Sequence, residues 1–513
     1  MKIQINPEET MVLKVATKII SIIIILAILA ACAPAATPAP PTAAPKPTDP
    51  PKAAAPTSAP TIVPAQPTKA PEPTQAPTKA PEPTKPAAPT AAQKPTDPVA
   101  STPIPGKKVV TWWSHWANEP AKVQVIEQIV KDYETANPDV DIILVWWDKN
   151  PLRDAIRNTM TAGKGAPDIT TFDTEVVEWV KAGWLADLES VLPWENFNPA
   201  AKLDGQYAGI KGNYKYNIGA AYNIILYNKE AFQKAGVTVP ANFQFTQDEY
   251  LDVIKKCKAA GYAGNAQAIG NRPVTAYFAP MWLLFNLTGP AGLEKYWKGE
   301  SSWDTPEVRQ VLNYMVDLTK AGFWPPTLTT MTIDEYHVYF HTQRKSCMLW
   351  VPTWYTGRAF KPEKDGGQSP DFKFGMLRYP AMKGSQYNDY VLAGFESGYA
   401  VLTQGKVQDI AKDILKFASQ PKYGALWVAL TNSPTVIKYQ AKDMPKVEGA
   451  EKWQWYWDEF NKVYGPLKVA TPDTTHCGDF EAALVSLVSQ GLSQGLVTVD
   501  EVIKGMNAKL CKK

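Results

Sequence analysis

The sequence predicts an α/β protein with two lobes, built on parallel strands that helices cover on both faces. From residue 107 onward, short apolar runs alternate with longer segments whose apolar residues recur at helical spacing. This alternation is typical of parallel strands joined by helices, and continuous apolar runs are typical of strands buried on both faces. About 400 residues follow the pattern, which is large for a single layered unit, so two lobes are expected.

The first part of this region is assigned element by element. Residues 109–113 form a compact apolar strand, and residues 120–136 carry apolar side chains at helical spacing until Asn137-Pro138 ends the helix. The next predicted elements are a strand at 140–147, a helix at 152–162, a strand at 169–172 and a helix from Val176 to near Gly183.

The rest of the chain predicts further helices and strands in a less regular order. The predicted helices are 229–236, 246–260, 306–321, 406–419 and 480–490, and the predicted strands are 220–227, 347–351 and 398–402.

The N-terminus has the features of a targeting segment. The apolar run from Ile19 to Ala31 is short for a membrane span, which needs roughly 20 residues, but suits the core of a signal peptide. The run ends in Leu29-Ala30-Ala31-Cys32, which resembles the bacterial lipobox, whose cysteine is lipidated. We therefore expect residues 1–32 to be a lipoprotein signal, with acyl chains on Cys32 holding the protein at the extracellular face of the cell membrane. The alternative is an ordinary buried cysteine at a cleavage site.

Residues 33–105 are predicted to be a disordered tether. They contain 23 of the 46 prolines of the chain, and PTKAPEPT occurs at 67–74 and again at 77–84. Such a segment buries almost nothing and favours extended polyproline-like chain, at about 3.1 Å per residue. It would lift a folded domain off the membrane; the alternative is a proline-rich ligand for a partner domain.

Four cysteines lie in the folded part: Cys257, Cys347, Cys477 and Cys511. Outside the cytoplasm they permit two disulfides in three connectivities, and Cys477–Cys511 is mildly favoured because both residues lie in the C-terminal segment. The sequence leaves the pairing open. The absence of a CxxC spacing argues against zinc and thiol-redox chemistry. The small formal net charge, +3, gives no reason to expect a nucleic acid as a partner.

Polar and aromatic residues follow the first three predicted strands. They are Ser114-His115-Trp116, Trp147-Asp148 and Asp173-Thr174. In open α/β sheets, ligands bind beyond the carboxyl ends of the strands. The sequence therefore predicts a ligand site at this edge of the first sheet.

Several motifs, in order, resemble the extracellular solute-binding proteins of ABC importers, in particular the sugar-binding group that includes maltose-binding protein. Each motif is weak alone, but together they cover most of 107–430. They are Ala162-Gly163 leading into Ala166-Pro167-Asp168-Ile169, the GWLADL run at 183–188, YNKEAFQKAG at 227–236, and SCMLW at 346–350 followed by Trp354.

The resemblance implies a two-lobed periplasmic-binding-protein fold (type II-like), with discontinuous lobes joined by a hinge and a cleft between them. Lobe 1 would be residues 106–220 with 392–435, and lobe 2 residues 221–391 with 436–513. The chain would cross near 217–221, near Ala393 and around 432–440. The lobes would close on a carbohydrate, an oligosaccharide by preference, and the closed form would be read by the permease of an ABC importer. A monomer without metal or cofactor is expected.

Eight residues are candidates for contact with the sugar. Proteins bind the CH faces of sugars with flat aromatic rings, and their hydroxyls with carboxylates, amides and arginines. Asp173 matches a family carboxylate, with a helix N-cap as its alternative role, and Trp354 matches a stacking tryptophan, with core packing as its alternative. The other candidates are His115, Trp116, Asp148, Tyr222, Asn223 and Glu396.

The three tryptophans of VVTWWSHW, at 109–116, are expected to have different surroundings. Alternation along a strand sends Trp112 and Trp113 to opposite faces of the sheet, where both are expected to be buried. Trp116 lies past the strand, where its ring is expected to face the solute.

Other readings of the sequence are weaker. His337 and His341 are four residues apart, but the zinc motif HExxH needs a glutamate where Val338 stands. GFESG at 394–398 has its serine one place late for a nucleophile elbow. The remaining alternatives are a binding protein for a non-sugar solute, a sensor subunit, and a surface glycoside hydrolase using Asp173 and Glu396.

Overall fold

The computed structural model describes residues 101–172, 176–207, 210–473 and 479–511. The predicted signal segment with Cys32 and the tether up to residue 100 lie outside the described residues, as do Asp173 and Cys477. None of the helices in the described part is long and apolar enough to cross a membrane.

The first sheet has four strands in the order β2–β1–β3–β9. β1 (Lys108–Ser114) is parallel to β2 (Val140–Trp146) and to β3 (Ile169–Phe172), as the sequence predicts. β9 (Gly398–Val401) instead runs antiparallel to β3. It enters from the opposite end because only two residues separate it from a strand of the second sheet.

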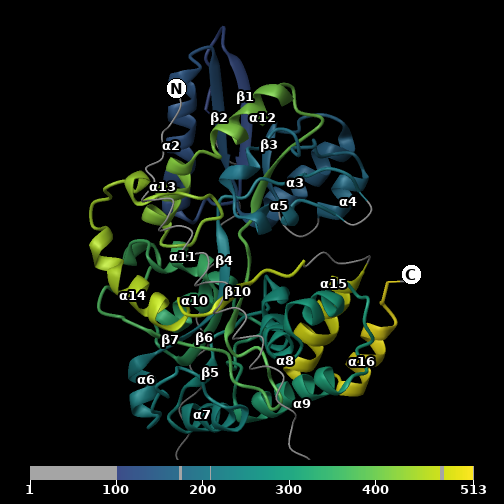
Figure 1. The fold of residues 1–513 in the computed structure, drawn as a ribbon, viewed down its shortest axis with the longest axis vertical. Helices are drawn as coiled ribbons and strands as arrows, with labels where there is room; N and C mark the ends of the chain where they lie inside the picture. Colours follow the sequence, from purple (N-terminus) through teal and green to yellow (C-terminus); the bar gives the residue numbers. More distant parts are fainter. Residues whose placement is uncertain (1–100, 173–175, 208–209, 474–478, 512–513) are drawn as a thin grey trace, which may run out of the picture. The chain divides into compact units, whose positions relative to one another are not determined.

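Helices cover both faces of the first sheet (Figure 1). One face packs against α2 (Pro120–Ala136), α12 (Gln408–Phe417) and α13 (Pro421–Thr431), and the other against α3 (Lys149–Ala162) and α4 (Val176–Lys181). Trp112 lies in the first of these cores and Trp113 at the edge of the second, which confirms that they point to opposite faces. Trp112 is fully buried, as predicted, but the prediction of burial is wrong for Trp113, which lies near the end of β1 and is half-buried against Trp147, with ring centroids 5.0 Å apart.

The second sheet is mixed, with the strand order β10–β8–β4–β6–β5 and with β7 also paired to β4. β4 is antiparallel to β6, β7 and β8, so the prediction of parallel strands does not extend to the middle of this sheet. The strands are β4 (Ala220–Tyr227), β5 (Ala263–Asn265), β6 (Ser346–Pro352), β7 (Gly375–Leu377), β8 (Tyr390–Phe395) and β10 (Lys468–Ala470).

Alternate residues of the second sheet belong to two different cores. In β6, Met348 and Trp350 lie in one core, while Leu349 and Val351 lie in the other. The first core is covered by α7 (Gln247–Ala259), α8 (Phe278–Trp297), α9 (Pro306–Ala321), α15 (Phe480–Ala483) and α16 (Val499–Asn507). The second is covered by α10 (Ile333–His341), α11 (Thr356–Ala359) and α14 (Gln454–Val463), so this sheet too is buried on both faces.

Helix α8 is the largest element that the sequence did not predict. Gly289 has a φ of 69° and interrupts the helical backbone, and Pro290 follows it. A side chain at Gly289 would also meet the ring of Tyr387 at 2.3 Å, so glycine is required here both by conformation and by space. The chain of α8 reverses its direction at Gly289. The ring of Trp297, at the end of α8, therefore lies 5.7 Å from the ring of Tyr277, the residue before its start.

Smaller elements complete the described part. The predicted helix 480–490 is α15 followed by a π-helix, η8 (Leu484–Gly491), and short helices lie elsewhere along the chain. They are α5 (Pro199–Asp204), α6 (Lys229–Lys234), η2 (Trp194–Asn196), η3 (Pro273–Tyr277), η4 (Thr353–Tyr355), η5 (Glu363–Asp365), η6 (Ala441–Asp443), η7 (Ala450–Trp453) and η9 (Leu492–Gln494).

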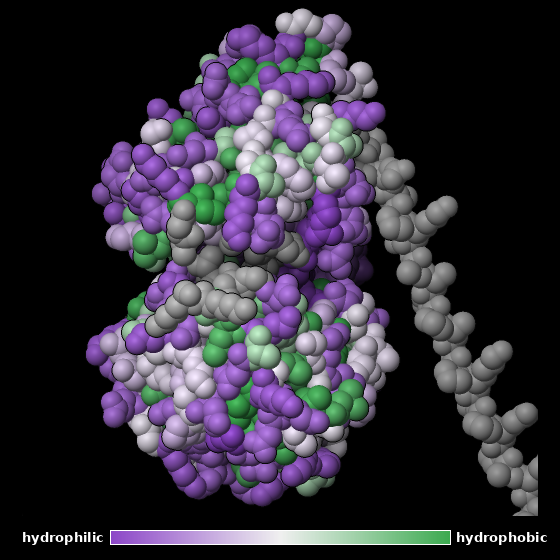
Figure 2. All heavy atoms as spheres, turned by 90° about the vertical axis from the view of Figure 1, so that its right-hand side faces the viewer, coloured by the Kyte–Doolittle hydropathy of each residue, from purple (hydrophilic) through white to green (hydrophobic). Residues whose placement is uncertain are grey.

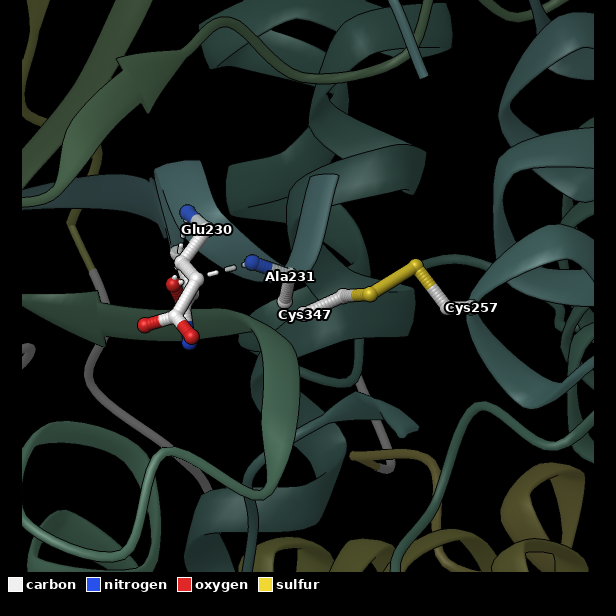
Figure 3. Close-up of a disulfide and its surroundings, with 5 residues drawn as sticks. Glu230, Ala231, Cys257 and Cys347 are labelled. Carbon is white, nitrogen blue, oxygen red and sulfur yellow. Dashed lines mark hydrogen bonds between the residues drawn. A yellow bond between two sulfur atoms is a disulfide. The ribbon is translucent and has the colours of Figure 1, made fainter. Parts of the chain in front are cut away.

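A disulfide joins Cys257 in α7 to Cys347 in β6, across the packing between helix and sheet (Figure 3). Their Cα atoms are 6.1 Å apart, within the ordinary range for a disulfide. Cys511 is also disulfide-bonded, but Cys477 lies outside the described residues, so its predicted pairing with Cys511 stays a prediction.

Three stretches of chain meet between the two sheets. The amide of Glu396, between β8 and β9, donates to the carbonyl of Gly219 at 3.0 Å, and the amide of Ala220 donates to the carbonyl of Pro434 at 2.8 Å. A Cβ at Gly219 would lie 2.6 Å from the Trp427 ring and 2.9 Å from the Glu396 side chain. Glycine at this position thus lets the crossing segments pack closely; the predicted lobe boundaries themselves stay a prediction.

The molecular surface is mainly hydrophilic on the face shown in Figure 2, with hydrophobic residues in small groups. Such scattered apolar exposure is ordinary for a protein in water. The large hydrophobic residues that are exposed in the described part are Ile104, Leu203, Tyr439, Met444, Val469 and Leu496.

Candidate functional site

A cavity of about 530 Å³ opens at the carboxyl ends of β1, β2 and β6. Its volume falls in the range of small-molecule sites. Of the eight candidates from the sequence, six line it: His115, Trp116, Asp148, Asn223, Trp354 and Glu396. Asp173 lies outside the described residues, and Tyr222 is not among the lining residues.

The loops after β1 and β2 form one wall of the cavity. The parallel register places Ser114 opposite Trp146, so the residues that follow the two strands lie side by side. The side-chain amide of Asn118 donates to Asp148 Oδ1 at 3.0 Å and links the two loops. Asp148 is exposed, so its carboxylate is accessible from the cavity.

Trp116 is more deeply buried than its position after the strand predicts. Only 1% of its surface is exposed, and its ring packs against Tyr399 at 5.3 Å and Trp427 at 5.4 Å. Lys122 Nζ lies 5.1 Å from its centroid, within the range of a cation–π contact. Trp116 therefore supports the wall of the cavity and offers a solute little of its own surface.

Tyr222 and Asn223 are neighbours in β4 and point to opposite faces of the strand. Asn223 lines the cavity, whereas the ring of Tyr222 packs against Phe460 at 5.6 Å in the core beneath α14. Burial raises the pKa of Tyr222, as expected for a phenol held in an apolar core.

Trp354 lies in η4, directly after β6, and is half-buried at the cavity wall. The guanidinium carbon of Arg358, one helical turn further on, lies 5.3 Å from the Trp354 centroid. The His337 ring lies 5.6 Å away. These neighbours fix the orientation of the Trp354 ring and leave part of it facing the cavity.

A buried ion cluster forms the wall between the two sheets. Lys122 Nζ lies 2.7 Å from Glu119 Oε2 and forms a second ion pair with Glu396 Oε2. The hydroxyl of Ser433 donates to the other oxygen of Glu396 at 2.7 Å. Glu396 lines the cavity, but both of its carboxylate oxygens are therefore engaged by the protein.

Burial and the neighbouring charges shift the pKa values of the three groups in this cluster. Burial by itself would raise the pKa of Glu119, but Lys122 and Arg358 outweigh it and lower the pKa to about 2. Burial would likewise lower the pKa of Lys122, but Glu119 and Glu396 raise it above its usual value. For Glu396, burial is the larger effect and raises its pKa, although Lys122 opposes the shift.

Arg358 connects this cluster to the helices of the second sheet. Its guanidinium lies 3.4 Å from Glu119, at the start of α2, and 3.2 Å from Asp334, in α10. Because α2 covers the first sheet and α10 and α11 cover the second, Arg358 forms an ion pair between the two parts of the molecule.

The two histidines in α10 have different surroundings. His341 is hydrogen bonded through Nδ1 to Tyr355 Oη at 2.8 Å and through Nε2 to the Gly366 carbonyl at 3.1 Å. His337 is buried, and neither of its ring nitrogens has a hydrogen-bond partner among the described residues. Burial lowers the pKa of both histidines, to about 4 for His341.

Several lining residues were not identified from the sequence. Several of the charged ones lie on helices or directly before them, and these include Glu119, Lys122, Arg358, Asp334 and Glu481. One signal was present: Lys122 lies on the same helical face as Ile126, Ile129 and Tyr133, where an apolar residue would be expected. The aromatic residues Tyr277, Phe278 and Trp297 of η3 and α8 gave no comparable signal.

Fold and cavity together are those of a binding protein with two lobes, and comparison with known proteins agrees. The sequence profile of the bacterial extracellular solute-binding protein family matches residues 128–454, which is more than half of the chain. The protein therefore belongs to this family of substrate-binding transport proteins.

Its relatives are distant. An uncharacterized ABC transporter extracellular-binding protein of Pyrococcus horikoshii is 26% identical over 275 residues, which cover 50% of this chain and 59% of that protein. The mannitol-binding protein of Pseudomonas aeruginosa is 24% identical over 321 residues, which cover 59% of this chain and 67% of that protein.

Solved structures share the two-lobed fold. A structure from work on xylan utilization by Caldanaerobius polysaccharolyticus has a TM-score of 0.65 at 20% identity and covers 79% of this chain and 100% of that one. A chitin oligosaccharide binding protein has a TM-score of 0.64 at 20% identity, with 78% and 98% covered. At this level of identity the likeness shows the fold alone, and it confirms the fold class predicted from the sequence.

Proposed function

We propose that this protein captures a carbohydrate, and specifically an oligosaccharide, between its two lobes. It then delivers the sugar, chemically unchanged, to the permease subunits of an ABC importer. In this proposal the protein acts as a monomer on the extracellular face of the cell membrane, held there by acyl chains on Cys32 and by the tether at 33–105.

The observation that carries the proposal is the mixture of groups around the cavity. Aromatic rings such as Trp354 and Phe278 line it together with the carboxylate of Asp148 and the amide of Asn223. Flat rings suit the CH faces of sugars, and carboxylates and amides suit their hydroxyls. The sugar and sugar-alcohol binders among its relatives and structural neighbours support the same class of solute.

Closure of the lobes on the sugar is supported by the contacts around Arg358. This residue pairs with Glu119 across the two parts of the molecule, and its guanidinium lies against Trp354. A sugar stacked on Trp354 would thus lie next to a side chain that joins the lobes. A ligand shifts the equilibrium between the open and closed states by its differential affinity for the two states.

Calorimetric titration of the purified full chain with mono- and oligosaccharides tests the proposal directly. We expect binding to at least one sugar, and we expect Trp354→Ala to weaken it about tenfold, since a ring contact contributes roughly 0.5–1.5 kcal/mol beyond area burial. Trp184→Ala is the matched control, because Trp184 is also half-buried but packs against Trp179 away from the cavity.

Two outcomes would count against the proposal. Binding of an amino acid, a polyamine or a metal ion, without binding of any sugar, would overturn the class of solute. Turnover of chromogenic glycosides that is abolished by Glu396→Gln would instead favour an enzyme.

A further inference from the structure

Arg358 is paired with two carboxylates that belong to different parts of the molecule. Its Nη2 lies 3.4 Å from Glu119 Oε1, and Glu119 directly precedes α2, which covers the first sheet. Its Nε lies 3.2 Å from Asp334 Oδ1 in α10, and both α10 and α11, the helix of Arg358, cover the second sheet. The distance from Arg358 to Asp334 is therefore independent of how the two sheets are placed, whereas the distance from Arg358 to Glu119 depends on it.

The two carboxylates also differ in burial. The side chain of Asp334 is 51% exposed, whereas that of Glu119 is 5% exposed. Water competes for both charges of an exposed ion pair, so such a pair contributes little. If the two sheets move apart at this point, water reaches Glu119 and Arg358, and Arg358 keeps Asp334 as its partner.

The charge balance of the buried cluster depends on Arg358. Lys122 lies between Glu119 and Glu396, so a single ammonium group faces two carboxylates. The guanidinium of Arg358 supplies a second positive charge beside Glu119. Because a buried charge without compensation is costly, the enclosed arrangement of the cluster requires Arg358, whereas a hydrated arrangement does not.

Gly357 leaves the space in which this contact forms. A Cβ at Gly357 would lie 2.8 Å from Glu119 Oε2 and 3.4 Å from Lys122 Cε. Gly357 lies in α11, and alanine is normally preferred to glycine in a helix. The physical reason for glycine at this position is therefore the close approach of Glu119 and not the conformation of the backbone.

We propose that Arg358 is a latch between the two sheets, which keeps a measurable fraction of the protein closed without any solute. In the closed arrangement its guanidinium pairs with Glu119 and Asp334, and in the open arrangement it pairs with Asp334 alone. The guanidinium carbon lies 5.3 Å from the centroid of Trp354, so a solute on this ring adds its contacts beside the latch. This inference rests on the proposed function and deepens it, since it assigns a contact that controls how readily the lobes close.

Pulsed electron paramagnetic resonance tests the latch by measuring a distance between the two parts of the molecule in the absence of solute. The nitroxide labels are carried by p-acetylphenylalanine in place of Arg157 in α3 and Lys295 in α8, so no cysteine is changed. Both residues are exposed, and neither is among the residues that line the cavity. For the wild type we expect two distances, of which the shorter is that of the structure. In Arg358→Gln we expect the population with the shorter distance to fall by about fivefold or more, which is typical of a coupling between two states.

Gly357→Ala separates the latch from direct contact with the solute. The variant keeps every charge, and Gly357 is not among the described residues that line the cavity, but the added methyl group displaces the Glu119 carboxylate. We expect the shorter distance to be lost as in Arg358→Gln, and calorimetry to show sugar binding about fivefold weaker than in the wild type. Circular dichroism like that of the wild type shows that the variant is folded.

Arg309→Gln is the matched control for the loss of an arginine. Arg309 also lies between two carboxylates, those of Asp304 and Asp500, at 2.7 and 2.8 Å. All three residues lie on or next to helices α9 and α16, which cover the second sheet. We expect the distances and the sugar affinity of this variant to equal those of the wild type.

The latch and the proposed function fail on different results. If the wild type shows only the longer distance without solute, or if either Arg358→Gln or Gly357→Ala leaves the populations unchanged, the latch is wrong, and sugar binding is judged by calorimetry alone. If no carbohydrate binds to the wild type, the proposed function fails, and the distances measured without solute still decide whether Arg358 holds the two sheets together.

Discussion

The two sheets present side chains to one cavity by different means. The first sheet uses short loops directly after the parallel strands β1 and β2, so the register of the strands sets where His115 and Asp148 lie. The second sheet uses helices packed on both of its faces, together with a pair of stacked tryptophans, Trp282 and Trp350, and a disulfide. The first wall of the cavity therefore depends on strand pairing and on the ion cluster behind it, whereas the second wall depends on packing at a distance from the cavity.

The largest expected effect tests the ion cluster behind the first wall. Lys122→Met removes the cation between Glu119 and Glu396, and an uncompensated buried charge typically costs about 3–5 kcal/mol of stability. Urea denaturation measures the loss. Lys131→Met is the control, because Lys131 is exposed on the same helix and its replacement should change stability by roughly 0.5 kcal/mol or less. A loss below about 1 kcal/mol for Lys122→Met would mean that the cluster contributes little.

The second largest expected effect is a loss of stability that is confined to the region of the second sheet. Replacing Cys257 and Cys347 together by alanine opens a loop whose ends are 90 residues apart, and we expect stability to fall by about 2–4 kcal/mol. Hydrogen exchange should then rise in α7 and β6 and stay unchanged in β1. Equal increases around both sheets would show that the two regions unfold as one unit and would remove this difference between them.

The smallest expected effect is a loss of stability as the pH falls. His341 has a folded-state pKa of about 4, below its usual 6.5, so the unfolded state binds more protons as the pH falls below about 6.5. Stability should decline from there towards pH 4, by about 2 kcal/mol at pH 5 from this residue, and His337 acts in the same direction. In His341→Gln, denaturation between pH 5 and 7 should show a shallower decline. An unchanged slope would mean that other groups cause it.

The fold around the first sheet was largely predictable from the sequence. The predicted helix 120–136 and strand 169–172 match α2 and β3 at both ends, because period and end signals agree there. Helix α8 was missed because it is apolar on all sides and interrupted at Gly289, so it shows no amphipathic period. The mixed order of the second sheet was missed because pairing between distant strands leaves no local trace.

The candidate site was predictable where the backbone sets the position of a residue or where a family motif marks it, as at Trp354. Residues after strands, such as His115 and Asp148, were found because parallel strands end at one edge. The burial of Trp116 against Trp427 depends on a helix about 300 residues further along the chain. Arg358 and Phe278 were missed for the same reason, since a single sequence does not say which helix faces meet.

Two aromatic residues that line the cavity, Trp354 and Phe278, pack on separate cores, and this arrangement has an evolutionary consequence. Trp354 also contacts Arg358, which pairs with Glu119 in the ion cluster that holds Glu396. Substitutions around Phe278 can therefore accumulate without disturbing Trp354 or the crossing segments, whereas substitutions around Trp354 affect the contacts between the two sheets. A lineage of such proteins would be free to change the cavity lining near Phe278 while keeping the ion pairs that join the two sheets.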